Sequence, residues 1–294
     1  MSIRTVQVGV DLGGTKVHSV VLGEDMSILA EDTRLSGFGP EEVVRNLQAS
    51  ISDALAFLPD TSVSAIGIGT PGTVDSGTGI VRHSLNLGIQ SLDLRTPISG
   101  TFQCSVQVEN DVNATALGLS RIFPQYDSLC YLNFGTGLAA GFVINGSVWA
   151  GASGLAGEIG HIPLGSKTRK CNCGQSGCLE LFSSWSGLRK QLSGYENLTG
   201  ALKDRGSVPA VAEAWEEFIA NAVLSIQTVF LTLDPAMIFV GGGVVASSPE
   251  VFEEIKRRVV DLEEKAPLFA EKQVSRRIAR MPIDVPVAAI GALG

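Results

Sequence analysis

The feature that most constrains this chain is a pattern of strands and glycine turns that occurs twice. Residues 6–31 read as a strand, a glycine-rich turn, a second strand, a tight turn and a third strand, and residues 129–151 read the same way. In the second segment the tight turn falls on Asn145-Gly146, a dipeptide typical of two-residue β-hairpins. Such a repeat predicts two related halves, each opening with an antiparallel meander.

Around the two meanders, apolar residues recur at helical spacing in some segments and run continuously in others. Strands that alternate with helices predict α/β layers with largely buried sheets. The expected helices cover residues 40–57, 111–122, 209–233 and 249–264, and the expected strands cover 63–69, 105–109 and 236–243. We expect a domain boundary near residue 120, with an N-terminal α/β domain at 1–120 and a C-terminal α/β domain at 121–294.

Charge and hydropathy exclude several classes of function. The chain has 294 residues and a formal net charge of −8, whereas nucleic-acid binding needs clustered Lys and Arg that neutralise phosphates. No run approaches about eighteen uninterrupted apolar residues, the length of a membrane span. Residues 1–12 lead directly into a strand pattern rather than an apolar leader. We therefore expect a cytoplasmic protein with no nucleic-acid or membrane partner.

Three glycine clusters end strand-like segments: DLGGTK at 11–16, FGTG at 134–137 and VGGG at 240–243. Glycines at a bend let backbone N–H groups approach a phosphate closely, and Thr15 adds a hydroxyl donor. Asp11, at the end of its strand, has the carboxylate that could hold Mg²⁺ through water. Each cluster alone is also compatible with a plain glycine turn, but three in this order favour a polyphosphate site.

A polar loop near the middle of the chain carries His161, Cys171, Cys173 and Cys178. Four such ligands fit a closed tetrahedral Zn²⁺ site, which is structural rather than catalytic. Redox-active thiols are the alternative, whereas an odd count of five cysteines in a reducing compartment disfavours a disulfide framework. Cys104 and Cys130 lie in apolar runs and read as core residues.

The motifs, taken in order, resemble those of the ROK family of sugar kinases and related regulators, within the actin-like ATPase superfamily. The resemblance covers about residues 6–293 and rests on DLGGTK, GIGTPGTVDSGTGIV, ENDVNATALG, FGTG, GLAGEIGH, CNCGQSGCLE and VGGGV. It implies an α/β, two-domain actin-like ATPase (ribonuclease H-like) fold with a cleft between the halves, and a homodimer.

The same resemblance implies the site residues. Asp111 would be the general base that accepts the proton of a sugar hydroxyl, although Asn110 and Asp111 also read as a cap of the following helix. The residues implied to bind the sugar are Gly72, Asn86, Asn110, Asp111, Glu158, His161 and Glu180. Those implied to bind ATP are Asp11, Gly13, Gly14, Thr15, Lys16, Gly135, Thr136, Gly137, Gly241, Gly242 and Gly243.

The implied activity is ATP-dependent phosphorylation of the 6-hydroxyl of a hexose or N-acylhexosamine, with Mg²⁺ and structural Zn²⁺. Glucose is favoured, and the segments GIVRHS and DLRTP resemble the N-acetylmannosamine kinase branch. A sugar-sensing protein without catalysis is the alternative class. Only ten residues precede Asp11, too few for a winged helix-turn-helix, so a DNA-binding repressor is not expected. Valine at Gly14 or Gly137 is expected to obstruct the nucleotide and to spare the sugar site.

Overall fold

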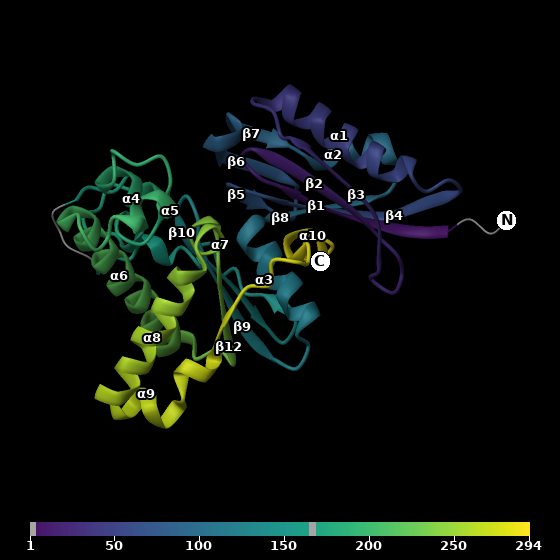
Figure 1. The fold of residues 1–294 in the computed structure, drawn as a ribbon. Coiled ribbons are helices and arrows are strands. Elements are labelled where there is room, and N and C mark those ends of the chain that lie inside the picture. The colour runs from purple at the N-terminus through teal and green to yellow at the C-terminus, as the bar shows by residue number, and fades with distance from the viewer. Residues whose placement is uncertain (1–3, 165–168) are drawn as a thin grey trace. The chain divides into compact units, whose positions relative to one another are not determined.

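The computed structural model describes residues 4–164 and 169–294 (Figure 1). The chain forms two compact units. The first takes in the described residues up to Gln125 together with Gly146–Val148 and Asp284–Gly294. The second consists of Tyr126–Asn145 and Trp149–Ile283.

The strands form three sheets. In chain order they are β1 Arg4–Leu12, β2 Lys16–Leu22, β3 Ile28–Leu35, β4 Thr61–Thr70, β5 Thr73–Asp75, β6 Ile80–Ser84, β7 Ile89–Asp93, β8 Ser105–Asn110, β9 Ser128–Phe134, β10 Leu138–Ile144, β11 Ser147–Val148, β12 Met237–Gly241 and β13 Ile278–Arg280.

The helices connect and cover these strands. The α-helices are α1 Pro40–Ala56, α2 Arg95–Phe102, α3 Asp111–Ile122, α4 Trp185–Gln191, α5 Leu198–Lys203, α6 Pro209–Leu233, α7 Gly243–Ser247, α8 Pro249–Lys265, α9 Pro267–Lys272 and α10 Val287–Ala292. The 3₁₀ turns are η1 Leu85–Leu87, η2 Ile159–His161, η3 Leu179–Leu181 and η4 Val274–Arg277.

The two large sheets have the same strand order, which confirms the internal repeat. The first runs β3-β2-β1-β4-β8 and the second β11-β10-β9-β12-β13. In each, an antiparallel meander is extended by two parallel strands, β4 and β8 or β12 and β13. A third sheet, β5-β6-β7, belongs to the first unit. The seven helices and strands predicted outside the meanders are all present, as α1, α3, α6, α8, β4, β8 and β12.

In the first unit, alternate residues of β1 and β4 face opposite sides of the sheet, as in any strand. Val10 and Ile68 face the side covered by α1 and join its core. Gly9 and Gly67 face the other side, where the backbone of α10 lies so close that neither position has room for a Cβ. Both faces of the sheet are therefore covered at β1 and β4.

The last helix corrects the predicted domain limits of 1–120 and 121–294. Residues 284–294 belong to the first compact unit, because α10 packs on β1, β4 and α3. A Cβ at Gly118 of α3 would collide with the carbonyl of Val287, so glycine is what permits this backbone-to-backbone approach. The chain thus returns to its first unit at the end, and the border in the middle falls between Gln125 and Tyr126.

Helix α6 is the longest helix of the second unit and forms much of its core. Its buried face includes Phe218 and Ile226, which pack in the same cluster as Leu132 of β9 and Ile238 of β12. Among the described residues, α6 is the one helix long and apolar enough to cross a membrane by length and composition. One such helix is weak evidence for a membrane span, because core helices pass the same test, and packing in the core accounts for the apolar character of α6.

Candidate functional site

The first glycine turn joins β1 to β2 in the first unit. It is closed by a hydrogen bond from the backbone N–H of Gly13 to the carbonyl of Lys16, at 2.9 Å. Ser36 holds it from outside: its N–H donates to the Thr15 carbonyl at 3.0 Å and its hydroxyl donates to the Gly13 carbonyl at 2.6 Å. Ser36 thus engages the carbonyls of both Gly13 and Thr15.

Two carboxyl groups lie together beside this turn. Asp11 pairs in register with Gly69 of β4, and an added Cβ at Gly69 would contact the Cα of Asp111, which begins α3. Burial raises the pKa of Asp11, with His18 opposing the shift. Burial, and next the charge of Asp11, raise the pKa of Asp111 to about 6, although the N–H of Val112 donates to its carboxylate. A carboxyl group poised near neutral pH suits general-base catalysis.

The side chain of Asn110 makes hydrogen bonds that stabilise the local structure. Its Oδ1 caps α3 by accepting from the N–H groups of Val112 and Asn113, at 3.0 and 3.2 Å. Its Nδ2 donates to the carbonyl of Gly72 at 3.2 Å. The capping interpretation from the sequence is therefore confirmed. These bonds also fix Asn110 and Gly72, two of the predicted sugar residues, relative to each other and to Asp111.

The predicted sugar residue Asn86 lies against the first turn. It belongs to η1 and is exposed, and an alanine Cβ at Gly14 would lie only 2.7 Å from the Cβ of Asn86. Real Cβ atoms essentially never approach another heavy atom within 3.0 Å. A larger residue at Gly14 would therefore displace Asn86, which argues against the expectation that such a change spares the predicted sugar residues.

The second glycine turn joins β9 to β10 in the second unit. Its internal bond runs from the N–H of Gly135 to the carbonyl of Gly137, at 3.0 Å. The start of α4 holds it from outside, because the N–H groups of Trp185 and Ser186 donate to the carbonyls of Gly135 and Thr136, at 2.8 and 3.2 Å. In both turns, a segment distant in sequence donates hydrogen bonds to two carbonyls of the turn.

Glu180 lies on the second turn. Its Oε2 accepts a hydrogen bond from the N–H of Leu138 at 3.1 Å, and an alanine Cβ at Gly137 would lie 2.5 Å from the same oxygen. The second of the two valine substitutions would therefore also disturb a predicted sugar residue. The sequence carried no sign of this contact, because the donor is a backbone group.

Glu158 and His161 are positioned by the β10 backbone. Gly157 and Gly160 press against the carbonyls of Ala140 and Leu138, where neither has room for a Cβ, and the Ala140 N–H donates to the Gly157 carbonyl at 2.8 Å. The segment that carries both side chains is thereby fixed on the strand that leaves the second turn. The Nε2 of His161 lies 3.9 Å from Oε2 of Glu158.

The three glycines after β12 differ in their surroundings. A Cβ at Gly241 would strike the ring of Tyr131, so this glycine serves packing in the core. Gly242 has a φ of 91° and no room for a Cβ beside Asn133. Gly243, at the start of α7, has open space around its Cβ position. Of the three, Gly243 is the position that a ligand could approach.

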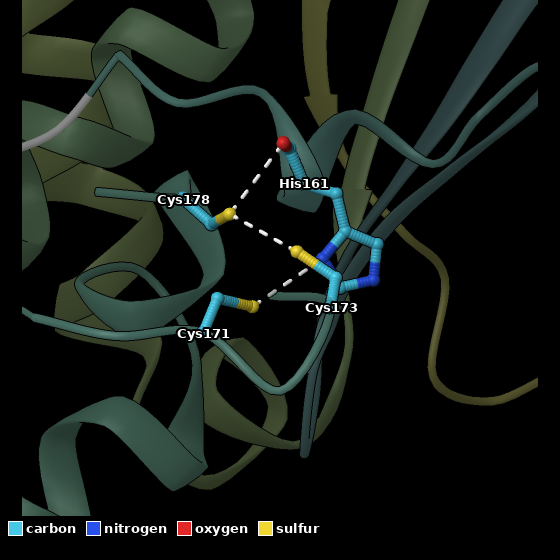
Figure 2. A group of neighbouring side chains, drawn as sticks. All are labelled: His161, Cys171, Cys173 and Cys178. Atoms are coloured by element: carbon cyan, nitrogen blue, oxygen red, sulfur yellow. Dashed lines mark hydrogen bonds between the residues drawn. The ribbon is translucent and has the colours of Figure 1, made fainter. Parts of the chain in front are cut away.

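His161, Cys171, Cys173 and Cys178 meet as the sequence predicted (Figure 2). Their ligand atoms all lie within 4.8 Å of one another. Sγ of Cys171 is 3.6 Å from Nδ1 of His161, and Sγ of Cys173 is 3.5 Å from Sγ of Cys178. A disulfide has an S–S distance of about 2.05 Å, so these thiols are separate, and all five cysteines of the chain are free.

The donor set fits Zn²⁺. Tetrahedral Zn²⁺ with bonds of about 2.3 Å to sulfur places two sulfur ligands about 3.8 Å apart. Two of the distances in the cluster, 3.5 and 3.6 Å, are close to this value. Nδ1 of His161 is the ring nitrogen beside Cys171, and Nε2 lies on the side of Glu158. The turn that presents Cys171 is closed by its N–H donating to the Gln175 carbonyl at 2.9 Å. Backbone hydrogen bonding from Gln175 lowers the pKa of the Cys173 thiol to about 7.

Each unit therefore brings together its own set of predicted residues. The first unit groups Asp11, Gly13, Gly14, Thr15 and Lys16 with Gly72, Asn86, Asn110 and Asp111. The second groups Gly135, Thr136 and Gly137 with Glu158, His161, Glu180 and the cysteines, and also carries Gly241, Gly242 and Gly243. Sequence reasoning missed Ser36 and Leu138, whose hydrogen bonds reach residues 23 and 42 positions away and are marked by no motif.

The chain belongs to the ROK family, whose model matches residues 7–277. A glucokinase from Thermotoga maritima is 31% identical over 283 residues, covering 86% of this chain and 87% of the relative. An N-acetyl-D-glucosamine kinase from Haemophilus influenzae is 29% identical, covering 80% and 83%. A xylose repressor from Bacillus subtilis is 27% identical, covering 86% and 68%. The relatives thus include both sugar kinases and repressors.

Solved structures agree on the fold. A ROK hexokinase from Thermus thermophilus matches with a TM-score of 0.83 and 25% identity, covering 98% of this chain and 96% of that one. A ROK family glucokinase from Streptomyces griseus, in complex with glucose and AMPPNP, matches with a TM-score of 0.75 and 24% identity, covering 98% of each chain. The fold is the two-domain actin-like ATPase fold, as the resemblance implied.

Proposed function

We propose that this protein is an ATP-dependent sugar kinase that phosphorylates the 6-hydroxyl of a hexose, with glucose as the favoured substrate. The observation that carries this proposal is Asp111, a carboxyl group at the start of α3 whose pKa is raised to about 6. Near neutral pH it is largely ionised, yet basic enough to accept the proton of an attacking hydroxyl. A protein that only senses sugar has no need for such a base.

In the proposed reaction the sugar O6 attacks the γ-phosphorus of ATP as the bond to the β–γ bridging oxygen breaks. Asp111 takes the proton from O6, and ADP leaves with the bridging oxygen. The N–H of Val112 and the capping of α3 by Asn110 hold the base in place. The base is therefore fixed before substrate arrives, which lowers the entropic cost of reaction.

Asp11 is the residue we assign to Mg²⁺. Burial raises its pKa, so its ionised form is disfavoured in the protein alone and would be favoured beside a divalent cation. Mg²⁺ supplies charge neutralisation on the transferred phosphoryl group. The glycine turns at 13–16 and 135–137, with Gly243, are assigned to the phosphates and nucleotide.

The sugar ligands assigned in the second unit are Glu158, His161 and Glu180, and the adjacent zinc site stabilises the loop that carries them. Zn²⁺ on Nδ1 of His161 would fix the ring and leave Nε2 as a donor to a sugar oxygen. Cys178 directly precedes η3, which contains Glu180. The metal is thus assigned a structural role.

The proposal is tested by ADP release with purified protein, ATP and Mg²⁺ against glucose, mannose, fructose, N-acetylglucosamine and N-acetylmannosamine. We expect the highest kcat/KM with glucose and loss of turnover in Asp111→Asn. A preference for N-acetylmannosamine would support the second substrate of the resemblance, whereas sugar binding without ADP release from any sugar would favour a sensor.

A further inference from the structure

Each glycine turn contains one glycine that faces a proposed sugar ligand and one that does not. An alanine Cβ would lie 2.7 Å from Asn86 Cβ at Gly14, and 2.5 Å from Glu180 Oε2 at Gly137. At Gly13 and Gly135 it would meet only atoms of the same or the preceding segment, the Lys16 carbonyl and the Asn133 side chain, each at 3.2 Å. Each turn therefore offers two glycines whose substitutions can be compared, Gly14 with Gly13 and Gly137 with Gly135.

At Gly14 and Gly137, the two glycines that face a proposed sugar ligand, glycine is required by the lack of space and not by the backbone conformation. Of the described glycines with a left-handed φ, none is Gly13, Gly14, Gly135 or Gly137. All four therefore have backbone angles that alanine adopts without this strain. At Gly14 and Gly137, however, a methyl group would occupy space that now belongs to Asn86 or Glu180.

The second turn also determines where the Glu180 carboxylate lies. Leu138, directly after Gly137, donates its N–H to Oε2, and the N–H groups of Trp185 and Ser186 bond the carbonyls of Gly135 and Thr136. The segment 180–186 is thus joined to the turn by three hydrogen bonds. The bond from Leu138 occupies Oε2 of Glu180.

On the basis of the proposed function, we propose that Gly14 and Gly137 are positioning residues for the sugar, in addition to any role at the phosphates. Gly14 leaves the space that Asn86 fills, and Gly137 lets Glu180 reach the Leu138 N–H. Sugar affinity is thereby determined in part by the nucleotide turns, and one turn residue in each unit fixes one sugar ligand of that unit.

The test compares four single variants of the whole protein in two matched pairs, Gly14→Ala with Gly13→Ala, and Gly137→Ala with Gly135→Ala. Calorimetry measures glucose binding without nucleotide, and AMPPNP binding without sugar. We expect Gly14→Ala and Gly137→Ala to weaken glucose binding at least about tenfold, a loss of about 1.4 kcal/mol. Gly13→Ala and Gly135→Ala should bind glucose within about twofold of wild type.

A rescue separates positioning from general damage to the fold. Glu180→Asp shortens the side chain and withdraws its oxygens from the methyl group that Gly137→Ala introduces. The shortening should therefore cost less affinity in the Gly137→Ala background than in wild type. It should also restore any folding that Gly137→Ala loses. Additive losses in this double-mutant cycle would contradict the inference.

Three other results would overturn it. Wild-type glucose affinity in both Gly14→Ala and Gly137→Ala would show that the facing glycines do not position the ligands, while the proposed function would stand. Equal losses of glucose affinity in the two variants of each pair would show that the whole turn, and not the facing glycine, affects sugar binding. If wild-type protein binds none of the five sugars, the proposed function fails, and the inference fails with it.

Discussion

The charge of Asp11 helps to raise the pKa of Asp111, so the proposed general base is tuned by a residue at the end of a different strand. Burial is the larger cause, and the N–H of Val112 works in the opposite direction. A helix N-terminus favours a negative charge, but desolvation outweighs this effect at Asp111, and the result is a proposed base poised near neutrality.

This relationship predicts the pH dependence of the reaction. Asp111 must lose its proton to act as a base, so kcat/KM should fall as pH decreases through about 6. Asp11→Asn removes the neighbouring charge, lowers the pKa of Asp111 and should move this midpoint to lower pH. The exposed Asp25→Asn is the control and should leave the midpoint unchanged. Profiles measured at saturating Mg²⁺ check both points, and an unmoved midpoint in Asp11→Asn would refute the coupling.

Asp111→Asn should lower the activity of the protein and raise its stability at pH 8. The amide cannot accept a proton, so kcat should fall by orders of magnitude while glucose affinity changes little. The pKa of Asp111 is about 6 in the folded protein, above the ordinary value of 3.8. Ionisation is therefore less favourable in the folded than in the unfolded state, and the free energy of unfolding decreases as pH rises from about 4 to 6. At pH 8 the variant should therefore be more stable by up to about 3 kcal/mol. Denaturation at pH 8 and pH 4 measures this, and the gain should vanish at pH 4.

Removal of a zinc ligand should weaken sugar binding before nucleotide binding. Cys173→Ser breaks a site expected to hold about one zinc per chain, and loosens the loop between His161 and Glu180. Elemental analysis and calorimetry with glucose and AMPPNP measure the two effects. Cys104→Ser, outside the cluster, should keep both metal and sugar affinity. Wild-type protein without zinc would remove the metal assignment.

Ser36→Ala should weaken nucleotide binding through the first turn. The change deletes the hydroxyl bond to the Gly13 carbonyl and leaves the backbone bond to Thr15, so the turn loses one of two supports. We expect AMPPNP affinity to fall several-fold and stability to fall by about 1 kcal/mol. Ser50→Ala deletes another hydroxyl bond, to Ser19, and should cost similar stability with unchanged AMPPNP affinity. Equal AMPPNP affinities in the two variants would contradict the role of Ser36.

The amino-acid sequence was sufficient to predict the repeat, the glycine turns, the main helices and the cluster of His161 with three cysteines. These features depend on residues that are close in the chain: alternation sets a strand, a 3.6-residue period sets a helix, and cysteines at short spacing meet around one loop. The ROK motifs are likewise local runs of residues, so the amino-acid sequence is sufficient to identify the family.

The contacts of the glycine turns with Asn86 and Glu180 could be found only in the folded structure. Leu138 and Glu180 are separated by 42 positions, and their hydrogen bond uses a backbone N–H that every residue except proline possesses. The return of α10 to the first unit likewise depends on Gly9, Gly67 and Gly118, whose spacing alone marks no interface. The pKa of Asp111 follows from burial and from Asp11, and both arise when β1 and β8 join one sheet. Such properties arise from packing between distant segments, whereas sequence patterns encode what neighbouring residues do.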